Sequence, residues 1–360
     1  MKITGLQCLQ ESISLTKPFK TALRTVSEID SVKVRLELEN GQTGWGAAAP
    51  TLAITGDSLA SIKGAINGPI QNAVMGGEIE NLEGLLIAVQ KSCVGNTSAK
   101  AAVDIALHDL YCSIFQIPLY QLLGGQANEL ETDITVGLDD PSVMQNDAIQ
   151  RVGEGFNVLK IKVGNDEHQD IRRIETIRNV LGPDVRLRLD ANQGWTRKQA
   201  VRIIQRLEER DLGIELIEQP VSAADIEGLK FVTERVNTPV MADESVFSPH
   251  GAFQILKESA VDLLNIKLMK CGGIRNALQI AAIAEAAGVE CMIGSMMESR
   301  LSVTAAAHVA AAHNNITRYD LDAALWLKTE SVKGGIRYEG KTLTLPKGPG
   351  LGIYEQPVSN

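Results

Sequence analysis

Aromatic side chains are scarce in this sequence: Phe, Trp and Tyr together make up 4% of the 360 residues. A core of that size must therefore be built from Leu, Ile, Val and Ala. Apolar runs long enough to cross a bilayer are also lacking, and the strand-like alternation of residues 1–15 leaves no apolar core for a secretion signal. These absences argue against a membrane protein, and we expect no membrane partner.

Positive charge and paired cysteines are scarce as well. The net charge of −9 argues against nucleic acid as a partner, because a phosphate-binding surface needs an excess of Lys and Arg. The five cysteines are scattered and include no C-x-x-C pair, a pattern typical of reduced, buried thiols rather than of a disulfide framework. We therefore expect a cytoplasmic protein.

From about residue 130 onward the chain repeats one unit, a short β-branched run followed by a turn and an amphipathic helix. Eight strand-like runs occur, with room for one crossover helix between each run and the next. The runs are TDITVGL (132–138), NVLKIKV (157–163), VRLRLDA (185–191), IELIEQP (214–220), TPVMADE (238–244), DLLNIKL (262–268), VECMIGS (289–295) and TRYDLDA (317–323). This pattern predicts an α/β fold, a TIM-type (β/α)7β barrel over residues 126–329, although an open doubly wound sheet would show the same periodicity.

The first 125 residues follow the pattern of an α+β domain instead. Two alternating runs meet at Asn40-Gly41, a strong hairpin signal, and helical segments follow. Residues 330–360 contain a further hairpin pattern, IRYEGKTLTL, and are expected to return to the first domain. The sequence thus predicts two domains, 1–125 joined by 330–360, and 126–329.

Three carboxylates occupy equivalent positions at the ends of consecutive predicted strands: Asp190 in DAN, Glu218 in EQP and Asp243 in ADES. The steps between them are 28 and 25 residues, one βα unit each, so a barrel brings all three to the rim at the carboxyl ends of its strands. Oxygen ligands without His or Cys suit Mg²⁺ rather than zinc. A single Asp at such a turn is often only a helix cap, but three in successive units predict a magnesium site.

Lysines flank this acidic triad on both sides. Lys160 and Lys162, in KIK, face the same way on one strand, and Lys267, in NIK, comes from across the barrel. A neighbouring ammonium disfavours protonation, so we expect Lys160 to lower the pKa of Lys162 towards that of a general base. One lysine would then remove a proton next to a carboxylate, Mg²⁺ would stabilise the enediolate, and the other lysine would return a proton from the opposite face.

The order and spacing of KIK, DAN, EQP, ADES and NIK resemble the muconate-lactonising branch of the enolase superfamily along nearly the whole chain. The resemblance implies that Lys162 and Lys267 are the acid/base pair, that Asp190, Glu218 and Asp243 bind Mg²⁺, and that an N-terminal capping domain closes the barrel mouth. The mandelate-racemase branch uses a His–Asp dyad, and none of the five histidines lies at the end of the seventh predicted strand.

The motif DLD in the last predicted strand, Asp320 to Asp322, resembles the D-x-D of dipeptide epimerases. There the two carboxylates bind the free α-ammonium of the substrate, and two acids facing the same way at the rim would attract a cation. The resemblance also places Phe19 and Arg24, in KPFKTALRT, over the substrate, with Arg24 pairing a glutamate side chain.

Lys160 and Met297 complete the expected substrate-binding set. Met297 lies in GSMMES, a segment expected to shape the pocket, although methionines are more often core filler. An isolated arginine in a loop is likewise more often a surface residue.

The sequence therefore predicts a Mg²⁺-dependent dipeptide epimerase that inverts the C-terminal residue of L-Ala-L/D-Glu or a related dipeptide, an activity linked to cell-wall peptide recycling. One alternative is a lyase or cycloisomerase such as o-succinylbenzoate synthase or muconate cycloisomerase, whose substrates lack such an ammonium. A second is a non-catalytic binding protein that retains the barrel. We expect a homo-oligomer, because most oligomeric soluble enzymes are homo-oligomers.

Overall fold

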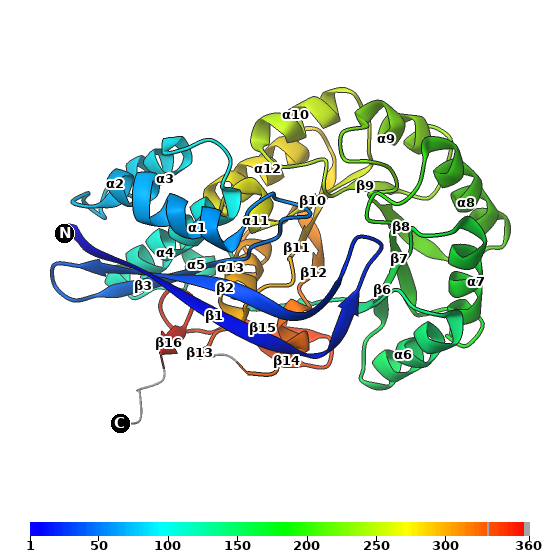
Figure 1. The fold of residues 1–360 in the computed structure, drawn as a ribbon, viewed down its shortest axis with the longest axis horizontal. Coiled ribbons are helices and arrows are strands. Elements are labelled where there is room, and N and C mark those ends of the chain that lie inside the picture. Colours follow the sequence, from blue (N-terminus) through cyan, green and yellow to red (C-terminus); the bar gives the residue numbers. More distant parts are fainter. Residues whose placement is uncertain (330, 356–360) are drawn as a thin grey trace.

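A barrel of parallel strands forms the larger part of the computed structural model, which describes residues 1–329 and 331–355 (Figure 1). Each strand pairs with its neighbour in chain order. The strands are β5 (Ile134–Val136), β6 (Val158–Lys162), β7 (Arg186–Asp190), β8 (Ile214–Glu218), β9 (Val240–Ala242), β10 (Leu263–Ile266), β11 (Glu290–Gly294) and β12 (Ile316–Asp320). The backbone N–H of Asp133 donates to Tyr319 O over 3.2 Å and closes the seam between β5 and β12. The open doubly wound alternative is therefore wrong.

Helices cover the outside of the barrel, one or more after each of the first seven strands (Figure 1). They are α6 (Pro141–Gly153), α7 (Glu167–Arg178), α8 (Arg197–Glu209), α9 (Ile226–Thr233), α10 (Pro249–Lys257), α11 (Leu268–Cys271), α12 (Ile274–Ala286) and α13 (Arg300–Ala310). The last strand is followed instead by a short 3₁₀ turn, η2 (Ala323–Trp326). The predicted (β/α)7β order is confirmed.

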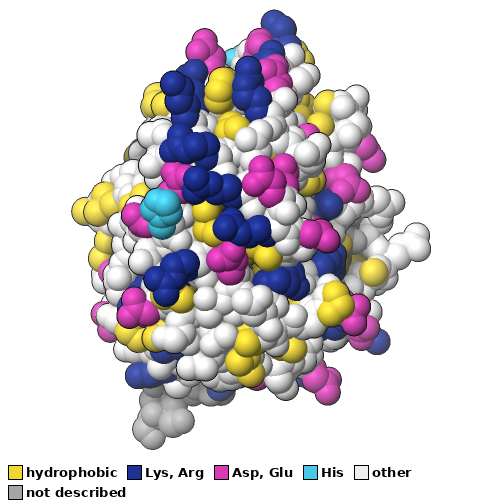
Figure 2. Space-filling model, turned by 90° about the vertical axis from the view of Figure 1, so that its right-hand side faces the viewer, with side chains coloured by type: hydrophobic (Ala, Val, Ile, Leu, Met, Phe, Trp, Pro, Cys, Tyr) yellow, Lys and Arg dark blue, Asp and Glu magenta, His cyan; other side chains and the backbone are white. Residues whose placement is uncertain are grey.

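The outer face of these helices is charged because their apolar faces are turned to the sheet. Figure 2 shows Lys and Arg side chains gathered in a band on the side where α7 and α8 lie. Arg202 and Arg206 of α8 both pair with Glu167 of α7, at 2.8 and 3.2 Å. Glu167 thus offsets part of the positive charge of these two side chains, and such exposed ion pairs are typical of a solvated surface.

The N-terminal domain packs helices against a three-stranded antiparallel sheet. Its elements are β1 (Ile3–Lys20), β2 (Thr25–Leu38), β3 (Thr43–Ala48), α1 (Leu59–Ala65), η1 (Ile66–Ile70), α2 (Gln71–Val74), α3 (Leu82–Lys91), α4 (Thr97–Phe115) and α5 (Leu119–Leu122). The β2–β3 turn contains Gly41 at φ 85°, so the Asn40-Gly41 hairpin is confirmed. A Cβ on Gly46 would lie 1.9 Å from Ala102 O, so only glycine lets α4 pack this closely on the sheet.

Contacts from this domain cap the barrel at two places. Asp104 of α4 accepts the backbone N–H of Ile274 at the start of α12, over 2.7 Å. The β1–β2 hairpin reaches from the N-terminal domain to the barrel (Figure 1), where Leu138 N donates to Lys20 O over 3.0 Å. Leu138 follows β5, so the hairpin tip lies at the carboxyl ends of the barrel strands.

The C-terminal tail adds short strands to both parts. The predicted hairpin is present as β14 (Arg337–Glu339) and β15 (Thr342–Thr344), and β15 pairs with β4 (Glu129–Glu131). The remaining strands are β13 (Val332–Gly334) and β16 (Ile353–Glu355), which pair with each other. Leu351 N donates to Asp109 of α4 over 2.7 Å, so the tail does return to the first domain. Residues 330 and 356–360 of the predicted tail lie outside the described residues, and the boundary at residue 125 stays a prediction.

Helices long and apolar enough to span a membrane are absent from residues 1–329 and 331–355.

Candidate active site

A pocket lies beneath the β1–β2 hairpin tip at the carboxyl ends of the barrel strands. Both domains contribute to its walls, and all eight residues predicted to act on or bind the substrate line it. The lining residues are Phe19, Thr21, Leu23, Arg24, Ile54, Thr135, Lys160, Lys162, Asn192, Lys267, Ser295, Met296, Met297, Asp320 and Asp322.

The three carboxylates predicted to bind metal lie below this pocket and have no exposed surface. Asp190 and Glu218 end β7 and β8 and are direct partners in the sheet, while Asp243 follows β9. Lys160 Nζ lies between the first two, 3.0 Å from Asp190 Oδ2 and 2.7 Å from Glu218 Oε2. Among the described residues, no three Asp, Glu, His or Cys side chains lie close enough together to hold a metal ion as they stand. In the acidic triad, lysine ammonium groups lie between the carboxylates.

Charge interactions separate the pKa values of these acids. Burial raises the pKa of Glu218 to about 7, and Asp190 adds to the effect. Burial also acts on Asp190, but Lys160 and Lys162 outweigh it and lower its pKa to about 2. Glu218 Oε2 is buried and accepts no hydrogen bond of good geometry, although Lys160 lies nearby. Three carboxylates, one of them with an unsatisfied oxygen, fit Mg²⁺. To admit the metal, the Lys160 ammonium would move towards its third partner, Asp320, which lies 2.7 Å away.

The two lysines predicted to be the acid/base pair reach the pocket from opposite sides of the barrel. Lys162 ends β6 and donates to Asp190 Oδ2 over 2.6 Å. Lys267 follows β10, four strands further round, and donates to Asp243 Oδ2 over 2.7 Å. Burial lowers the pKa of Lys267, but the neighbouring Asp243 outweighs burial and holds that pKa above its usual value.

Three further polar residues complete the network around the acidic triad. Lys270 is fully buried and donates to Asp243 Oδ1 over 2.5 Å. Asn192 Nδ2 lies 3.4 Å from Asp190 Oδ2 and 3.3 Å from Glu244 Oε1. Burial and the adjacent Asp243 raise the pKa of Glu244 to about 8. None of these residues is predicted from the sequence, although Asn192 stands in DAN, Glu244 in ADES, and Lys270 one helical turn after Lys267.

The DLD carboxylates have different partners. Asp320 Oδ2 accepts from Lys160 over 2.7 Å. Asp322 Oδ2 accepts from the backbone N–H of Thr135 over 2.8 Å and from the indole N–H of Trp326 over 3.1 Å. Burial and the neighbouring Asp320 raise the pKa of Asp322. A cationic group entering the pocket would stabilise its ionised form.

Arg24 lies at the hairpin tip and lines the pocket. Within the residues that the structure describes, its backbone hydrogen-bonds Thr21 and its guanidinium forms no ion pair. Partial burial lowers its pKa. A half-buried guanidinium without a carboxylate partner, in a pocket wall, is suited to an anionic ligand.

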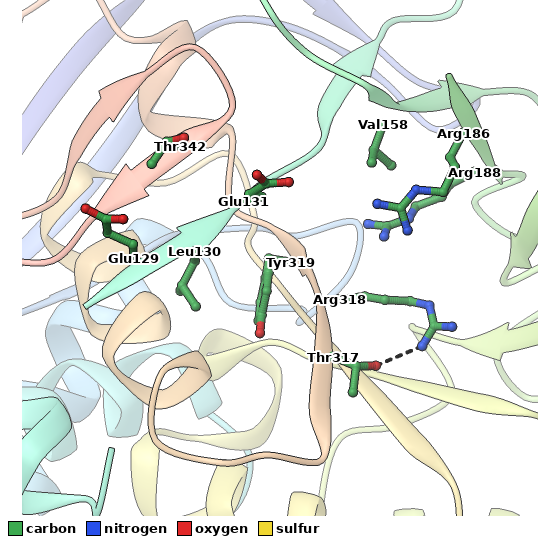
Figure 3. Close-up of a pocket in the computed structure, with 10 residues that line it drawn as sticks. All are labelled: Glu129, Leu130, Glu131, Val158, Arg186, Arg188, Thr317, Arg318, Tyr319 and Thr342. Carbon is green, nitrogen blue, oxygen red and sulfur yellow. Dashed lines mark hydrogen bonds between the residues drawn. The ribbon is translucent and has the colours of Figure 1, made fainter. Parts of the chain in front are cut away.

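A larger cavity lies at the opposite mouth of the barrel and is not the active site. It measures about 360 Å³ against about 50 Å³ for the pocket under the hairpin tip. Figure 3 shows the guanidinium groups of Arg186 and Arg188 close together there, with Arg318 opposite. Glu215 accepts from Arg188 Nε over 2.8 Å and from Arg318 Nε over 3.2 Å, so the arginines already have carboxylate partners. This cluster closes the base of the barrel.

Comparisons with known protein families divide the chain as the fold does. Residues 3–124 match the mandelate racemase/muconate lactonizing enzyme N-terminal domain, and residues 143–356 match the enolase C-terminal domain-like model.

Individual relatives match over nearly their full length. The L-Ala-D/L-Glu epimerase of Bacillus subtilis is 52% identical over 98% of this chain and 97% of the relative. Its substrate-liganded structure aligns with a TM-score of 0.98, covering 99% of this chain and 100% of that one. The hydrophobic dipeptide epimerase of Enterococcus faecalis is 48% identical over 98% of this chain and 99% of the relative. A dipeptide epimerase of that organism, complexed with Mg and L-Leu-L-Tyr, aligns with a TM-score of 0.95 at 47% identity, covering 99% and 100% of the two chains.

Proposed function

Because the chain belongs to the mandelate racemase/muconate lactonizing enzyme family of the enolase superfamily, we propose that it is a Mg²⁺-dependent dipeptide epimerase. One observation carries the proposal: two lysines from opposite sides of the barrel line the same pocket as the Asp320/Asp322 pair. Two bases on opposite faces of one carbon are what inversion by proton transfer requires. The acidic pair adds a place for the free ammonium of a dipeptide.

Each lysine has a role set by its place. Lys162 and Lys267 face the C-terminal α-carbon from opposite sides, so one removes its proton and the other returns a proton to the other face. Hydrogen bonds to Asp190 and Asp243 fix the two Nζ atoms. Carboxylates surround Lys160, outweigh burial and raise its pKa well above the usual value, so it stays protonated.

Asp190, Glu218 and Asp243 would hold Mg²⁺. When bound, the cation supplies positive charge beside the substrate carboxylate and so offsets the negative charge that develops as the α-proton leaves. Phe19 excludes water above Lys162, whose Nζ lies 6.0 Å from the centre of the ring.

Glutamate is the proposed C-terminal residue of the substrate. The relatives alone do not decide this, because one at 52% identity is named for L-Ala-D/L-Glu and one at 48% for hydrophobic dipeptides. Arg24 supports glutamate, because its guanidinium lines the pocket without an ion-pair partner within the described residues. Met297 and Met296 form an apolar wall suited to the small side chain of an N-terminal alanine.

The direct test is incubation with L-Ala-L-Glu and Mg²⁺ in D₂O, followed by proton NMR of the glutamate α-position. We expect loss of that signal, appearance of the Ala-D-Glu diastereomer, and loss of both effects when EDTA removes the metal. Exchange without the second diastereomer would mean that one base works on a poorly fitting substrate, and a dipeptide library would follow. No exchange with any dipeptide would favour the cycloisomerase or synthase reading, and metal-independent binding without exchange would favour a binding protein.

The cellular setting belongs to the proposal as well. We propose a cytoplasmic homo-oligomer that acts in recycling of cell-wall peptides. The five cysteines support a reducing compartment, since each is a free thiol. Light scattering coupled to size-exclusion chromatography would test the oligomeric state.

A further inference from the structure

We infer that Trp326 is a positioning residue for recognition of the substrate ammonium, acting through Asp322. The inference deepens the proposed function and rests on it. Trp326 touches neither the acidic triad nor the two lysines by hydrogen bond; its indole N–H goes to Asp322 Oδ2, 3.1 Å away.

Asp322 is a buried carboxylate that lacks a charge partner. Its neighbour Asp320 pairs with Lys160 at 2.7 Å, whereas Asp322 forms no ion pair within residues 1–329 and 331–355. The side chain is only 4% exposed yet lines the pocket. A buried, uncompensated carboxylate is costly, so the site is completed by a cation from outside the chain.

Two donors fix the orientation of this carboxylate. Both the backbone N–H of Thr135 on β5 and the indole N–H of Trp326 go to the same oxygen, Oδ2. The Thr135 hydroxyl also interacts with this carboxylate, which lines the pocket where the ammonium would bind. Of the two N–H donors, that of Thr135 belongs to the barrel backbone, so the indole N–H is the one that a side-chain substitution can remove.

The ring of Trp326 also supports the hairpin tip. Trp326 is 2% exposed and meets Phe19 edge to face, with ring centres 5.2 Å apart and planes at 83°. Lys17 Nζ of the same strand lies 5.1 Å from the centre of the indole ring. Trp326 therefore contacts both Asp322, which would bind the substrate ammonium, and Phe19, whose ring lies over Lys162.

The two contacts can be tested separately, because the indole N–H contacts Asp322 whereas the ring contacts Phe19. Trp326→Phe keeps a six-membered ring against Phe19 and removes the N–H donor. Trp326→His keeps an N–H, since imidazole Nε2 occupies the ring position of indole Nε1, and removes the larger ring. Trp45→Phe, in the N-terminal domain, is the matched control for loss of a buried indole.

The experiment compares L-Ala-L-Glu with propionyl-L-Glu, which has the same shape but no ammonium. Kinetics are followed by α-proton exchange in D₂O at pH 8, and propionyl-L-Glu is measured as a competitive inhibitor where its own exchange is too slow. We expect Trp326→Phe to lower the preference for the ammonium-bearing substrate about tenfold, the effect of one hydrogen bond to a charged group. Trp326→His and Trp45→Phe should keep the preference within about threefold of wild type.

Equal losses on both substrates in Trp326→Phe, an unchanged preference, or the same loss in Trp326→His would overturn the inference and leave the proposed function intact. A wild-type protein that turned over no dipeptide would overturn the proposed function and this inference with it. If Trp326→Phe failed to fold, the preference of Trp326→His would decide: retention supports the donor role, and loss refutes it.

Discussion

Replacing Arg24 with Met would test the proposed glutamate selectivity. Two unit charges about 4 Å apart interact with about 4 kcal/mol at an effective dielectric constant of about 20. Part of this is offset by desolvation of the substrate carboxylate, so we take about 2–3 kcal/mol as the net contribution to transition-state binding. The expected result is a fall of about 30- to 150-fold in kcat/KM for L-Ala-L-Glu.

The assay is initial rates of epimerisation for L-Ala-L-Glu and for the nearly isosteric, uncharged L-Ala-L-Gln. Arg24→Met should lower kcat/KM for the glutamine substrate less than about fivefold, since a neutral amide gains less from a guanidinium. Lys20→Met is the matched control: it removes a positive charge from the same hairpin tip, where Lys20 pairs with Asp139. We expect that control to change both rates by less than about threefold.

Stability gives an independent check on the same substitution. The lowered pKa of Arg24 shows that the folded protein disfavours its charged form, because burial removes water from the guanidinium without supplying a carboxylate. Arg24→Met should therefore leave the thermal unfolding midpoint unchanged or raise it. Equal losses of rate on the glutamate and glutamine substrates, or a clear drop in the midpoint, would refute the reasoning, because either would make Arg24 a structural residue.

Three further predictions concern the two lysines, the base of the barrel and pH. Lys267→Ala should abolish epimerisation and block α-proton exchange of one diastereomer, while the other still exchanges through Lys162; loss of exchange in both diastereomers, measured by NMR, would contradict separate faces. Glu215→Gln leaves Arg188 buried with only Asp133 as its partner, so urea unfolding should show a loss of about 2–4 kcal/mol, against less than about 1 kcal/mol for Glu290→Gln at the exposed rim. Burial lowers the pKa of His308 to about 3, and its Nδ1 accepts from Tyr120 N, so the folded protein holds it neutral. Its contribution to stability is full above the usual histidine pKa and is lost as pH falls from about 6.5 towards 3, by at most about 1.4 kcal/mol per pH unit. Denaturant midpoints between pH 7 and 4 should fall less steeply for His308→Asn, and equal slopes would disprove this assignment.

The barrel could be predicted because its local signals and its packing agree. Strand β6, for example, is a short run with the β-branched residues Val158 and Ile161, and α8 buries Ala200, Ile203, Ile204 and Leu207 on one face. The motifs at the strand ends favour the closed barrel, but periodicity alone cannot show closure, since it describes only neighbours along the chain. Closure of the barrel involves the hydrogen bond between Asp133 and Tyr319 at the first and last strands, and these two residues are far apart in the sequence.

The sequence predicts which residues lie together in the site, but it does not predict which of their atoms form hydrogen bonds and ion pairs. Steps of one βα unit each bring Asp190, Glu218 and Asp243 to one rim. Lys160, in contrast, finds its third carboxylate on β12, and Trp326 meets Asp322 through a 3₁₀ turn that leaves no signal in the sequence. Such contacts depend on the directions of side chains from elements far apart in the sequence. The spacing of motifs along the sequence does not give those directions.

Charge balance then links these contacts to the proposed chemistry. Around the pocket floor the structure gathers four lysines and six carboxylates, an excess of two negative charges: Lys160, Lys162, Lys267 and Lys270 with Asp190, Glu218, Asp243, Glu244, Asp320 and Asp322. Burial raises the pKa of Glu218 to about 7 and that of Glu244 to about 8, and the neighbouring carboxylates Asp190 and Asp243 add to the effect. One divalent cation cancels the excess of negative charge. L-Ala-Glu then adds one ammonium and two carboxylates, and Arg24 supplies the remaining positive charge. Mg²⁺ and an anionic dipeptide together would thus supply charge partners for the buried acids and for Arg24. The site would disfavour a substrate with a neutral side chain at Arg24 or without its ammonium at Asp322.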